Sequence, residues 1–435
     1  MNIFKNYLKD IVVLVKKNQK KLDLIEINDF KGVNLEIPPH NIGSDLSSNI
    51  CMILAKLNKL DPNKLAIKVK ELIKENIIDF KEIEIAKPGF LNICLSNEAL
   101  SNIINSILLE DNKFGSLKTN NTYNIEFVSA NPTGPMHIGH CRGAVFGDVL
   151  SNLLKFNGNK VTKEYYINDY GTQIKNFVKS VYLRIREIKY KENFSNEKDL
   201  YPGEYIKDIA KRVLAKSNMK FDSLNESYKS LEKESLYYSM KMIKSDLEKL
   251  GILHDSFVSE KSIVKSDTLE KALEKLKKTK HVEEGFLEPP KGEEVNNWKK
   301  TKKLIFKSVL FGDDTNRALQ KNDGSWTYFA NDLAYHSNKV LRKYDKLINV
   351  LGADHTGYVK RIKGAVQALS ENQTILECKV CQLVKLFKNG SPFKMSKRAG
   401  DFISVKDLLN EVNRDSIRFM MLNRSNDVEL EFDFE

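Results

Sequence analysis

The sequence predicts an α/β protein in which a parallel sheet is split by a helical insertion and preceded by a small α+β domain. Three observations support this prediction. Within residues 123–167, a short apolar stretch, a turn, a helical pattern and a second β-like stretch follow one another in the order of a βαβ unit. A similar alternation returns in residues 301–386. Between them, residues 175–300 are rich in Lys and Glu, have few apolar residues and show helical spacing.

The predicted N-terminal domain covers residues 1–115, where helical and β-like stretches alternate. Asp61-Pro62 is typical of a helix start, because proline is favoured at the first helical position. We therefore expect a small α+β unit. Its predicted helices include residues 47–60 and 62–76, and its predicted strands include residues 83–86 and 90–95.

The second predicted domain covers residues 116–385 and contains the βαβ unit. Strands that are parallel and sequential need a crossover helix, which explains the alternation. After the insertion at residues 175–300, we expect the sheet to resume. Three helices are also expected: one that begins at residue 137, one that ends at residue 344 and one that ends at residue 370. The expected strands are residues 124–129, 161–167, 301–311, 327–329, 347–352 and 375–386. Residues 386–435 are expected to hold a basic loop and the start of a helical region.

Composition excludes several classes of protein. The 435 residues are 41% hydrophobic and 29% charged, an ordinary balance that rules out collagen-like, disulfide-scaffold and wholly disordered chains. Lys and Arg number 70 against 58 Asp and Glu, which gives a net charge of +12. Such an excess suits a polyanionic partner such as nucleic acid, although solubility alone explains it equally well.

The cysteines and the N-terminal residues favour a reduced, cytosolic location. Five cysteines are scattered along the chain, and no signal peptide precedes them. The longest uncharged apolar run near the N-terminus, Ile11–Val15, is far too short to cross a membrane. Cys378 and Cys381 form a lone Cys-x-x-Cys with no second pair, so we expect no protein-bound metal.

One candidate functional segment, Asn131–His140, reads Asn-Pro-Thr-Gly-Pro-Met-His-Ile-Gly-His where a predicted strand leads into a helix. The N-terminus of a helix presents free N–H groups and a positive dipole end, which bind phosphates. His137 and His140 are three residues apart, so both side chains can face one ligand. Alternatively, they are incidental polar residues, but the strand–turn–helix setting favours a ligand site.

Three glycines, Gly139, Gly143 and Gly147, share one face of this predicted helix. Each glycine inside a helix costs about 1 kcal/mol relative to alanine, so three on one face indicate that something approaches closely. At Gly139 a flat nucleotide base could lie against the backbone. Packing of the helix on the sheet is the alternative explanation.

The second candidate segment, Pro392–Arg398, reads Pro-Phe-Lys-Met-Ser-Lys-Arg and is flanked by Gly390 and Gly400. It places three cations within five residues, and the flanking glycines would let the loop move. A mobile cationic loop suits the charge that develops when a nucleotidyl group is transferred and pyrophosphate leaves. A solvated basic turn is the alternative.

Together, His137–His140 and Lys394–Lys397 match the two signatures of the class I aminoacyl-tRNA synthetases, His-Ile-Gly-His and Lys-Met-Ser-Lys. They stand in the order of that superfamily, in the two halves of its split, Rossmann-like sheet. The surrounding residues narrow the resemblance to arginyl-tRNA synthetases of the bacterial type. The segments that resemble this family are Lys87–Asn92, Glu126–Pro135, Glu164–Gly171, Tyr201–Tyr205, Phe311–Asp314, Thr327–His336 and Gly352–Tyr358.

The resemblance implies ATP-dependent activation of L-arginine to arginyl-adenylate, followed by transfer to the 3′ end of tRNA(Arg). It implies ATP with Mg²⁺ as a substrate complex, an N-terminal domain that contacts the tRNA, and a cytoplasmic monomer. The implied catalytic residues are His137, His140, Lys394 and Lys397. The implied ATP-binding residues are Pro135, Gly139, Gly352, Asp354, Met395 and Ser396.

Arginine recognition has a physical requirement of its own. A guanidinium is planar, permanently charged and carries five donors, so its pocket needs carboxylates and neutral acceptors. Tyr328 and Asp332 lie one helical turn apart and supply both. The resemblance implies that arginine is bound by Glu126, Ser129, Asn131, His137, Tyr328, Asp332 and His355.

Two departures from the family pattern stand out. Where relatives often carry His-His-Gly, this chain has His355-Thr356-Gly357, which we expect to be tolerated. Relatives also continue past Phe432 into a helical anticodon-binding domain, whereas this sequence stops at Glu435, as a fragment or as a protein without that domain. Two alternatives therefore stay open: a non-catalytic tRNA-binding descendant of the family, and a nucleotidyltransferase that acts on a small molecule.

Overall fold

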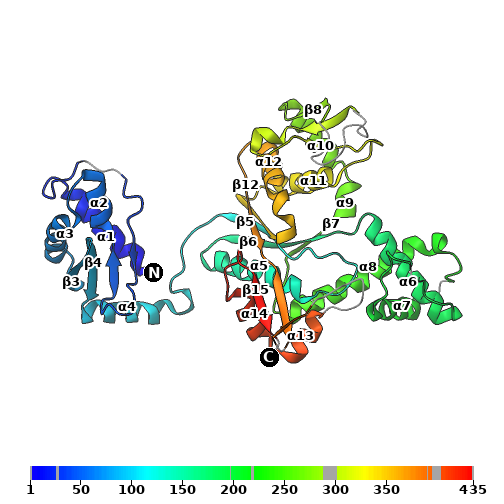
Figure 1. The fold of residues 1–435 in the computed structure, drawn as a ribbon, viewed down its shortest axis with the longest axis horizontal. Coiled ribbons are helices and arrows are strands. Elements are labelled where there is room, and N and C mark those ends of the chain that lie inside the picture. Colours follow the sequence, from blue (N-terminus) through cyan, green and yellow to red (C-terminus); the bar gives the residue numbers. More distant parts are fainter. Residues whose placement is uncertain are drawn as a thin grey trace. The chain divides into compact units, whose positions relative to one another are not determined.

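The computed structural model describes residues 2–25, 29–195, 197–216, 220–287, 301–388, 390–393 and 403–433. The chain divides into two compact units (Figure 1). The N-terminal unit comprises residues 1–118 with 156–158, and the larger unit comprises residues 119–155 with 159–435.

The N-terminal unit is an antiparallel four-stranded sheet with the strand order β1-β2-β4-β3, accompanied by helices. The predicted start of one helix is confirmed: the Asp61 side chain accepts hydrogen bonds from the N–H groups of Asn63 and Lys64. The elements are α1 (Ile3–Lys17), β1 (Leu35–Glu36), β2 (Leu46–Ser48), α2 (Ile50–Asn58), α3 (Pro62–Asn76), β3 (Phe80–Ala86), β4 (Phe90–Leu95) and α4 (Asn97–Glu110).

The larger unit is built on a parallel five-stranded sheet with the order β12-β11-β5-β6-β7. These strands are β5 (Thr122–Glu126), β6 (Lys160–Ile167), β7 (Ser256–Ser259), β11 (Lys346–Gly352) and β12 (Ile375–Cys381), and α5 (Ile138–Phe156) connects β5 to β6. The direction of winding reverses between β5 and β11. In open α/β sheets, ligands bind at the carboxyl ends of the strands at such a reversal.

Helices and two small sheets surround this parallel sheet (Figure 1). Those between β6 and β11 are α6 (Thr172–Tyr190), α7 (Glu204–Lys216), α8 (Leu224–Lys249), α9 (Glu260–Val264), α10 (Thr268–Lys278), β8 (Val282–Gly285), β9 (Lys303–Phe306), β10 (Arg317–Ala318) and α11 (Tyr328–Leu341). Those after β11 are α12 (Val359–Ser370), β13 (Val384–Lys388), β14 (Ser391–Phe393), α13 (Val405–Glu411), α14 (Arg414–Leu422) and β15 (Leu430–Asp433).

The structure corrects four details of the predicted sheet. Residues 175–300, expected to be helical, contain two four-residue strands, the edge strand β7 and β8, which are too short to show a period of their own. Residues 303–306 form β9, which pairs antiparallel in a separate sheet rather than in the parallel one. Thr327 is the N-cap of α11, so residues 327–329 begin a helix. The last predicted strand is two strands, β12 and β13.

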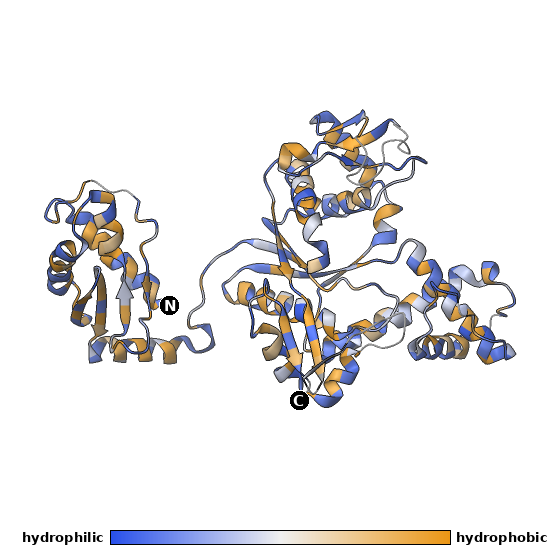
Figure 2. Cartoon of the chain, viewed as in Figure 1, coloured by the Kyte–Doolittle hydropathy of each residue, from blue (hydrophilic) through white to orange (hydrophobic). Residues whose placement is uncertain are grey.

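One hydrophobic core of the larger unit lies where α5 packs on the sheet, and two others lie around α10–α12 and among α6, α7 and α8 (Figure 2 colours the chain by hydropathy). Phe127 and Ile125 are fully buried in the first of these cores. A Cβ atom placed on Gly147 would lie 2.3 Å from Cγ of Phe127, whereas at Gly143 the nearest atom, in Val350, is 3.9 Å away. Close packing of the helix on the sheet therefore explains Gly147, which the sequence alone left open.

We expect Gly147→Ala to destabilise the larger unit by about 1–3 kcal/mol, because the added methyl overlaps the ring of Phe127. Gly143→Ala is the matched control, which should be neutral or stabilising because alanine is the better helix former. The N-terminal unit has no tryptophan in its sequence, and Trp326 belongs to the larger unit, so urea denaturation followed by tryptophan fluorescence reports on the larger unit. Equal stability of the two variants would contradict this account of the packing.

Candidate functional site

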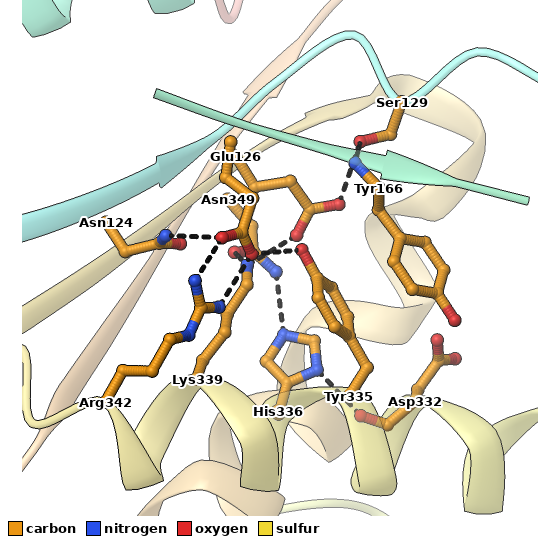
Figure 3. A network of polar contacts seen from close by, with 11 residues as sticks. Asn124, Glu126, Ser129, Tyr166, Asp332, Tyr335, His336, Lys339, Arg342 and Asn349 are labelled. Carbon is orange, nitrogen blue, oxygen red and sulfur yellow. Dashed lines mark hydrogen bonds and ion pairs between the residues drawn. The ribbon is translucent and has the colours of Figure 1, made fainter. Parts of the chain in front are cut away.

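A cavity of about 200 Å³ opens at the carboxyl ends of β5 and β11, where the order of the sheet reverses. Polar side chains from both strands, from β6 and from α11 surround it (Figure 3). Its lining includes Glu126, Ser129, Tyr166, Asn168, Asp332, Tyr335, His336, Asn349, Gly352, His355 and Tyr358.

Glu126, the last residue of β5, is neutralised from within the chain. Its carboxylate accepts a hydrogen bond of 2.5 Å from Nζ of Lys339, whose side chain is completely buried on α11. The same ammonium group donates to Oδ1 of Asn349 at 2.9 Å, and the Ser129 hydroxyl donates to the Glu126 carboxylate at 3.1 Å. Breaking such a buried pair is costly, because it leaves an uncompensated charge.

Glu164, on the neighbouring strand β6, is also fully paired. Arg342 binds its carboxylate through both terminal nitrogens, and the Tyr335 hydroxyl and the Asn124 amide donate to it at 2.8 and 3.1 Å. Burial alone would raise the pKa of Glu164, but the hydrogen bond from Arg342 and the charges of Lys339 and Arg342 lower it to about 2. The Glu164 carboxylate therefore stays ionised, and its hydrogen-bond partners are all supplied by the protein.

Asp332, on α11, has a different environment. Its carboxylate accepts a hydrogen bond from the Tyr358 hydroxyl, and no Lys or Arg in the described part of the chain forms an ion pair with it. Burial raises the pKa of Asp332 to about 7. The charge of Glu126 also raises this pKa, whereas the hydrogen bond from Tyr358 lowers it. Asp332 is thus a cavity-lining carboxylate that forms no ion pair in the described ranges, and only the charge of Lys339 and the hydrogen bond from Tyr358 act to lower its pKa.

Glu260, at the start of α9, is a second carboxylate of this kind. It is 9% exposed, and its hydrogen-bond partner is the side-chain amide of Asn331 at 3.3 Å. Burial raises the pKa of Glu260 to about 7, and the nearby charge of Asp332 adds to the effect. Two acidic groups without a basic partner favour a cationic ligand in the neighbouring cavity.

His336 fixes the orientation of the cavity wall. Its Nδ1 lies 2.8 Å from the backbone carbonyl of Asp332, so Nδ1 carries the proton and Nε2 accepts from the Asn349 amide at 2.9 Å. Burial lowers the pKa of His336 to about 4, so the ring is neutral at pH 7. The carbonyl oxygen of Asn349 is thereby directed at Lys339, which in turn holds Glu126.

The histidine segment lies at the N-terminus of α5. The rings of His137 and His140 stack 3.8 Å apart, and Nδ1 of His140 accepts from the backbone N–H of His137 at 3.2 Å. Backbone hydrogen bonds join Ile138 to Ile403 and Val405 to Met136, at 3.2 and 2.9 Å. The segment is therefore tied to the chain that directly follows the predicted lysine loop.

The structure brings together some of the predicted site residues. Glu126, Ser129, Asp332, Gly352 and His355 all line the cavity. Of the residues predicted at the phosphate end, His137, Gly139 and His140 lie together at the start of α5. Lys394, Met395, Ser396 and Lys397 lie outside the described residues.

Other predicted residues lie elsewhere. Tyr328 is 80% exposed, with its ring near Lys321 rather than in the cavity lining. Asn131 is exposed and donates to the Gln173 side chain at 2.9 Å. Asp354 is exposed beside His355, and Pro135 lines a separate cavity beside α7 and α8.

The sequence analysis missed several residues of this site, above all Lys339. Asp332, His336 and Lys339 are spaced i, i+4 and i+7, so they share one face of α11. That polar stripe on an otherwise apolar helix was a usable signal. Tyr166 and Tyr358 lie in two segments that resemble the family, but nothing in the sequence pattern distinguished them from aromatic residues of a core.

Neither a membrane span nor a metal cluster is found in the part of the chain that the structure describes. No helix there combines the length and the apolar character that crossing a bilayer requires. No group of three or more His, Cys, Asp or Glu side chains is placed to hold a metal ion.

Two family models match the chain. The model of the tRNA synthetases class I (R) catalytic domain matches residues 103–431, and the model of the arginyl tRNA synthetase N terminal domain matches residues 3–95. An arginine–tRNA ligase of Pelagibacter ubique is 53% identical and is matched over 100% of this chain and 76% of the relative. An arginine–tRNA ligase of the Wolbachia of Brugia malayi is 45% identical with the same coverage.

Solved structures give the same picture. A putative arginyl-tRNA synthetase from Campylobacter jejuni is 38% identical, with a TM-score of 0.68 over 78% of this chain and 71% of the other. The Thermus thermophilus arginyl-tRNA synthetase matches over 98% of this chain and 77% of its own, with a TM-score of 0.65. At 17% identity, this second match supports the fold alone.

Removal of the buried ammonium tests the ion pair. Lys339→Met should lower the free energy of unfolding by about 3–5 kcal/mol, because Glu126 is left buried and unpaired. The loss should be smaller at pH 5 than at pH 8, since the pKa of an unpaired buried carboxylate rises and protonation then neutralises it. Urea denaturation measures both effects.

Two further variants control this experiment. Lys360→Met changes an exposed lysine on α12 and should leave stability within about 0.5 kcal/mol. Lys339→Met combined with Glu126→Gln should recover part of the loss, because no charge remains unpaired. The pair is not important for stability if the single variant at position 339 is as stable as the control.

Proposed function

We propose that the cavity at the ends of β5 and β11 holds the side chain of arginine. The premise is that the chain belongs to the arginyl-tRNA synthetase family and is an arginine–tRNA ligase. The observation that carries this assignment is the charge of Asp332. Lys339 neutralises Glu126 and Arg342 neutralises Glu164, but no Lys or Arg among the described residues forms an ion pair with Asp332. A guanidinium supplies that charge, together with donors for neutral acceptors.

The remaining predicted residues then divide between the two ends of the substrate. Asn131 and His137 act near the α-amino and carboxylate groups, Ser129 and His355 line the side-chain pocket, and Tyr328 rotates inward from the start of α11. His137 and His140 donate to the ATP phosphates at the N-terminus of α5. Pro135, Gly139, Gly352, Asp354, Met395 and Ser396 contact the nucleotide.

The chemistry needs no covalent enzyme intermediate. A carboxylate oxygen of arginine attacks the α-phosphorus of ATP in line, the bond to the bridging oxygen breaks, and pyrophosphate leaves with that electron pair. Lys394 and Lys397 stabilise the negative charge that develops on the leaving group. A hydroxyl of the 3′-terminal ribose of tRNA then attacks the carbonyl carbon of the adenylate, and AMP leaves. Catalysis in both steps is mainly positioning and electrostatics.

Several further features belong to this proposal. Mg²⁺ enters with ATP, as part of the substrate complex. The N-terminal domain, residues 1–115, contacts tRNA(Arg), and the net charge of +12 of the whole chain favours binding of a nucleic acid. The enzyme acts as a monomer in the cytoplasm.

The experiment that tests this function is ATP–pyrophosphate exchange with each of the twenty amino acids, with and without tRNA. Of the twenty amino acids, we expect only arginine to support exchange. We also expect this exchange to require tRNA. Aminoacylation of tRNA(Arg) should follow the same preference. Equal exchange without tRNA would remove the expected requirement, and absence of exchange with arginine under all conditions would overturn the assignment.

The lysine loop gives a second test. Lys397→Ala should slow arginine-dependent exchange by about 10²–10³-fold, because it removes a group that stabilises the transition state. The KM for arginine should change little, since the lysine acts on the phosphates. Lys385, on β13, forms an exposed ion pair with Glu429, so Lys385→Ala is the control and should keep the wild-type rate. A wild-type rate for Lys397→Ala would refute the role of this loop.

A further inference from the structure

The hydroxyl group of Tyr166 has no hydrogen-bond partner among the described residues. Tyr166, on β6, is only 6% exposed, and its oxygen is shielded from solvent. A buried hydroxyl without a partner typically costs about 1–3 kcal/mol, so such groups are uncommon. Because Tyr166 lines the cavity, a ligand that enters there can satisfy this hydroxyl.

The ring of Tyr166 is held firmly. It stacks on Tyr335 with the ring centroids 4.0 Å apart and the planes 24° apart. Its backbone N–H donates to the Ser129 hydroxyl at 3.0 Å, and Ser129 donates onward to Glu126. The position of the hydroxyl is therefore set before any ligand binds, which reduces the entropy that binding must lose.

Carboxylates surround this hydroxyl. Burial raises the pKa of Tyr166, and the charges of Glu260, Asp332, Glu126 and Asp169 raise it further, so the group stays protonated and neutral. Figure 3 shows the hydroxyl end of Tyr166 directed toward the side of the close-up where Asp332 lies. Of these acids, Asp332 and Glu260 have no basic partner in the described ranges, so a cation placed among them also lies near the hydroxyl.

We propose that Tyr166 is a further specificity-determining residue of the arginine site, whose hydroxyl oxygen accepts an N–H of the guanidinium that Asp332 binds. This inference rests on the proposed function, because it assumes that arginine occupies the cavity. It assigns to Tyr166 a role that concerns selection of the side chain rather than the chemical step.

The geometry of the two cations explains the selectivity. The guanidinium is a planar fork with five donors, so it can bind Asp332 along one edge and the hydroxyl along another. The ammonium of lysine is a compact charge with three donors. Its three donors all lie on one nitrogen, so it cannot span two acceptors that the separate nitrogens of the fork reach, and a buried polar group left unpaired is the strongest source of discrimination between substrates.

The test compares two neighbouring tyrosines with the same substitution. Tyr165 and Tyr166 are adjacent on β6 and point to opposite faces of the sheet. The Tyr165 hydroxyl already donates to the carbonyl of Ala130 at 2.8 Å, and Tyr165 does not line the cavity. Tyr165→Phe therefore removes a hydroxyl that has a hydrogen-bond partner, whereas Tyr166→Phe removes one that has none among the described residues.

We expect Tyr166→Phe to raise the KM for arginine in the exchange assay by about 10- to 100-fold, the usual effect of losing a hydrogen bond to a charged group. The kcat should change less than the KM, and the preference for arginine over lysine should fall. The melting temperature of the ligand-free protein should stay equal or rise. Tyr165→Phe should show the reverse: a melting temperature lower by a few degrees and a wild-type KM.

The possible failures can be told apart. If the wild-type protein activates arginine and Tyr166→Phe keeps the wild-type KM and selectivity, this inference is wrong and the proposed function stands. If Tyr166→Phe melts at a lower temperature, as Tyr165→Phe should, the hydroxyl has a structural partner and the inference is likewise wrong. If the wild-type protein does not activate arginine, the proposed function itself fails. Calorimetric titration with arginine gives the binding readout without turnover.

Discussion

The buried pair of Glu126 and Lys339 is the interaction on which the rest of the site depends. It joins the end of β5 to α11 across 213 residues of sequence, at the point where the order of the sheet reverses. Because Lys339 neutralises Glu126, the acidic groups do not all repel one another, and a cavity can form beside them. Asn349 and His336 then orient the ammonium group and complete the wall.

This pairing divides the acidic residues of the crevice into two groups. Glu126 and Glu164 are ionised and permanently paired, with Lys339 and Arg342 respectively. Asp332 and Glu260 form no ion pair with a Lys or Arg in the described ranges, and burial raises their pKa values to about 7. The paired carboxylates, Glu126 and Glu164, hold the walls of the pocket in place. Asp332 and Glu260 favour the binding of a cation. A permanently charged guanidinium suits the second group better than any neutral side chain.

Much of this arrangement could be predicted from the sequence, because its signals are local. The turn Ala130–Pro135 between a strand and a helix places His137 and His140 at a helix N-terminus, and the βαβ order of β5, α5 and β6 follows from patterning. The strand β7 could not be predicted, since four residues between helices carry no usable period. The spacing of Asp332, His336 and Lys339 places Lys339 on the site face of α11, but its pairing with Glu126 could not be predicted, because a salt bridge between distant residues leaves no local pattern.

The central claim is that the guanidinium of arginine supplies the positive charge that pairs with Asp332. Release of protons on binding measures this pairing most directly. Calorimetric titration of the protein with arginine near pH 7, in buffers of different ionisation enthalpy, counts the protons released on binding. Guanidinium binding should ionise the protonated fraction of Asp332 and Glu260, so release is expected near pH 7 and none at pH 9. Binding without proton release near pH 7 would contradict the account.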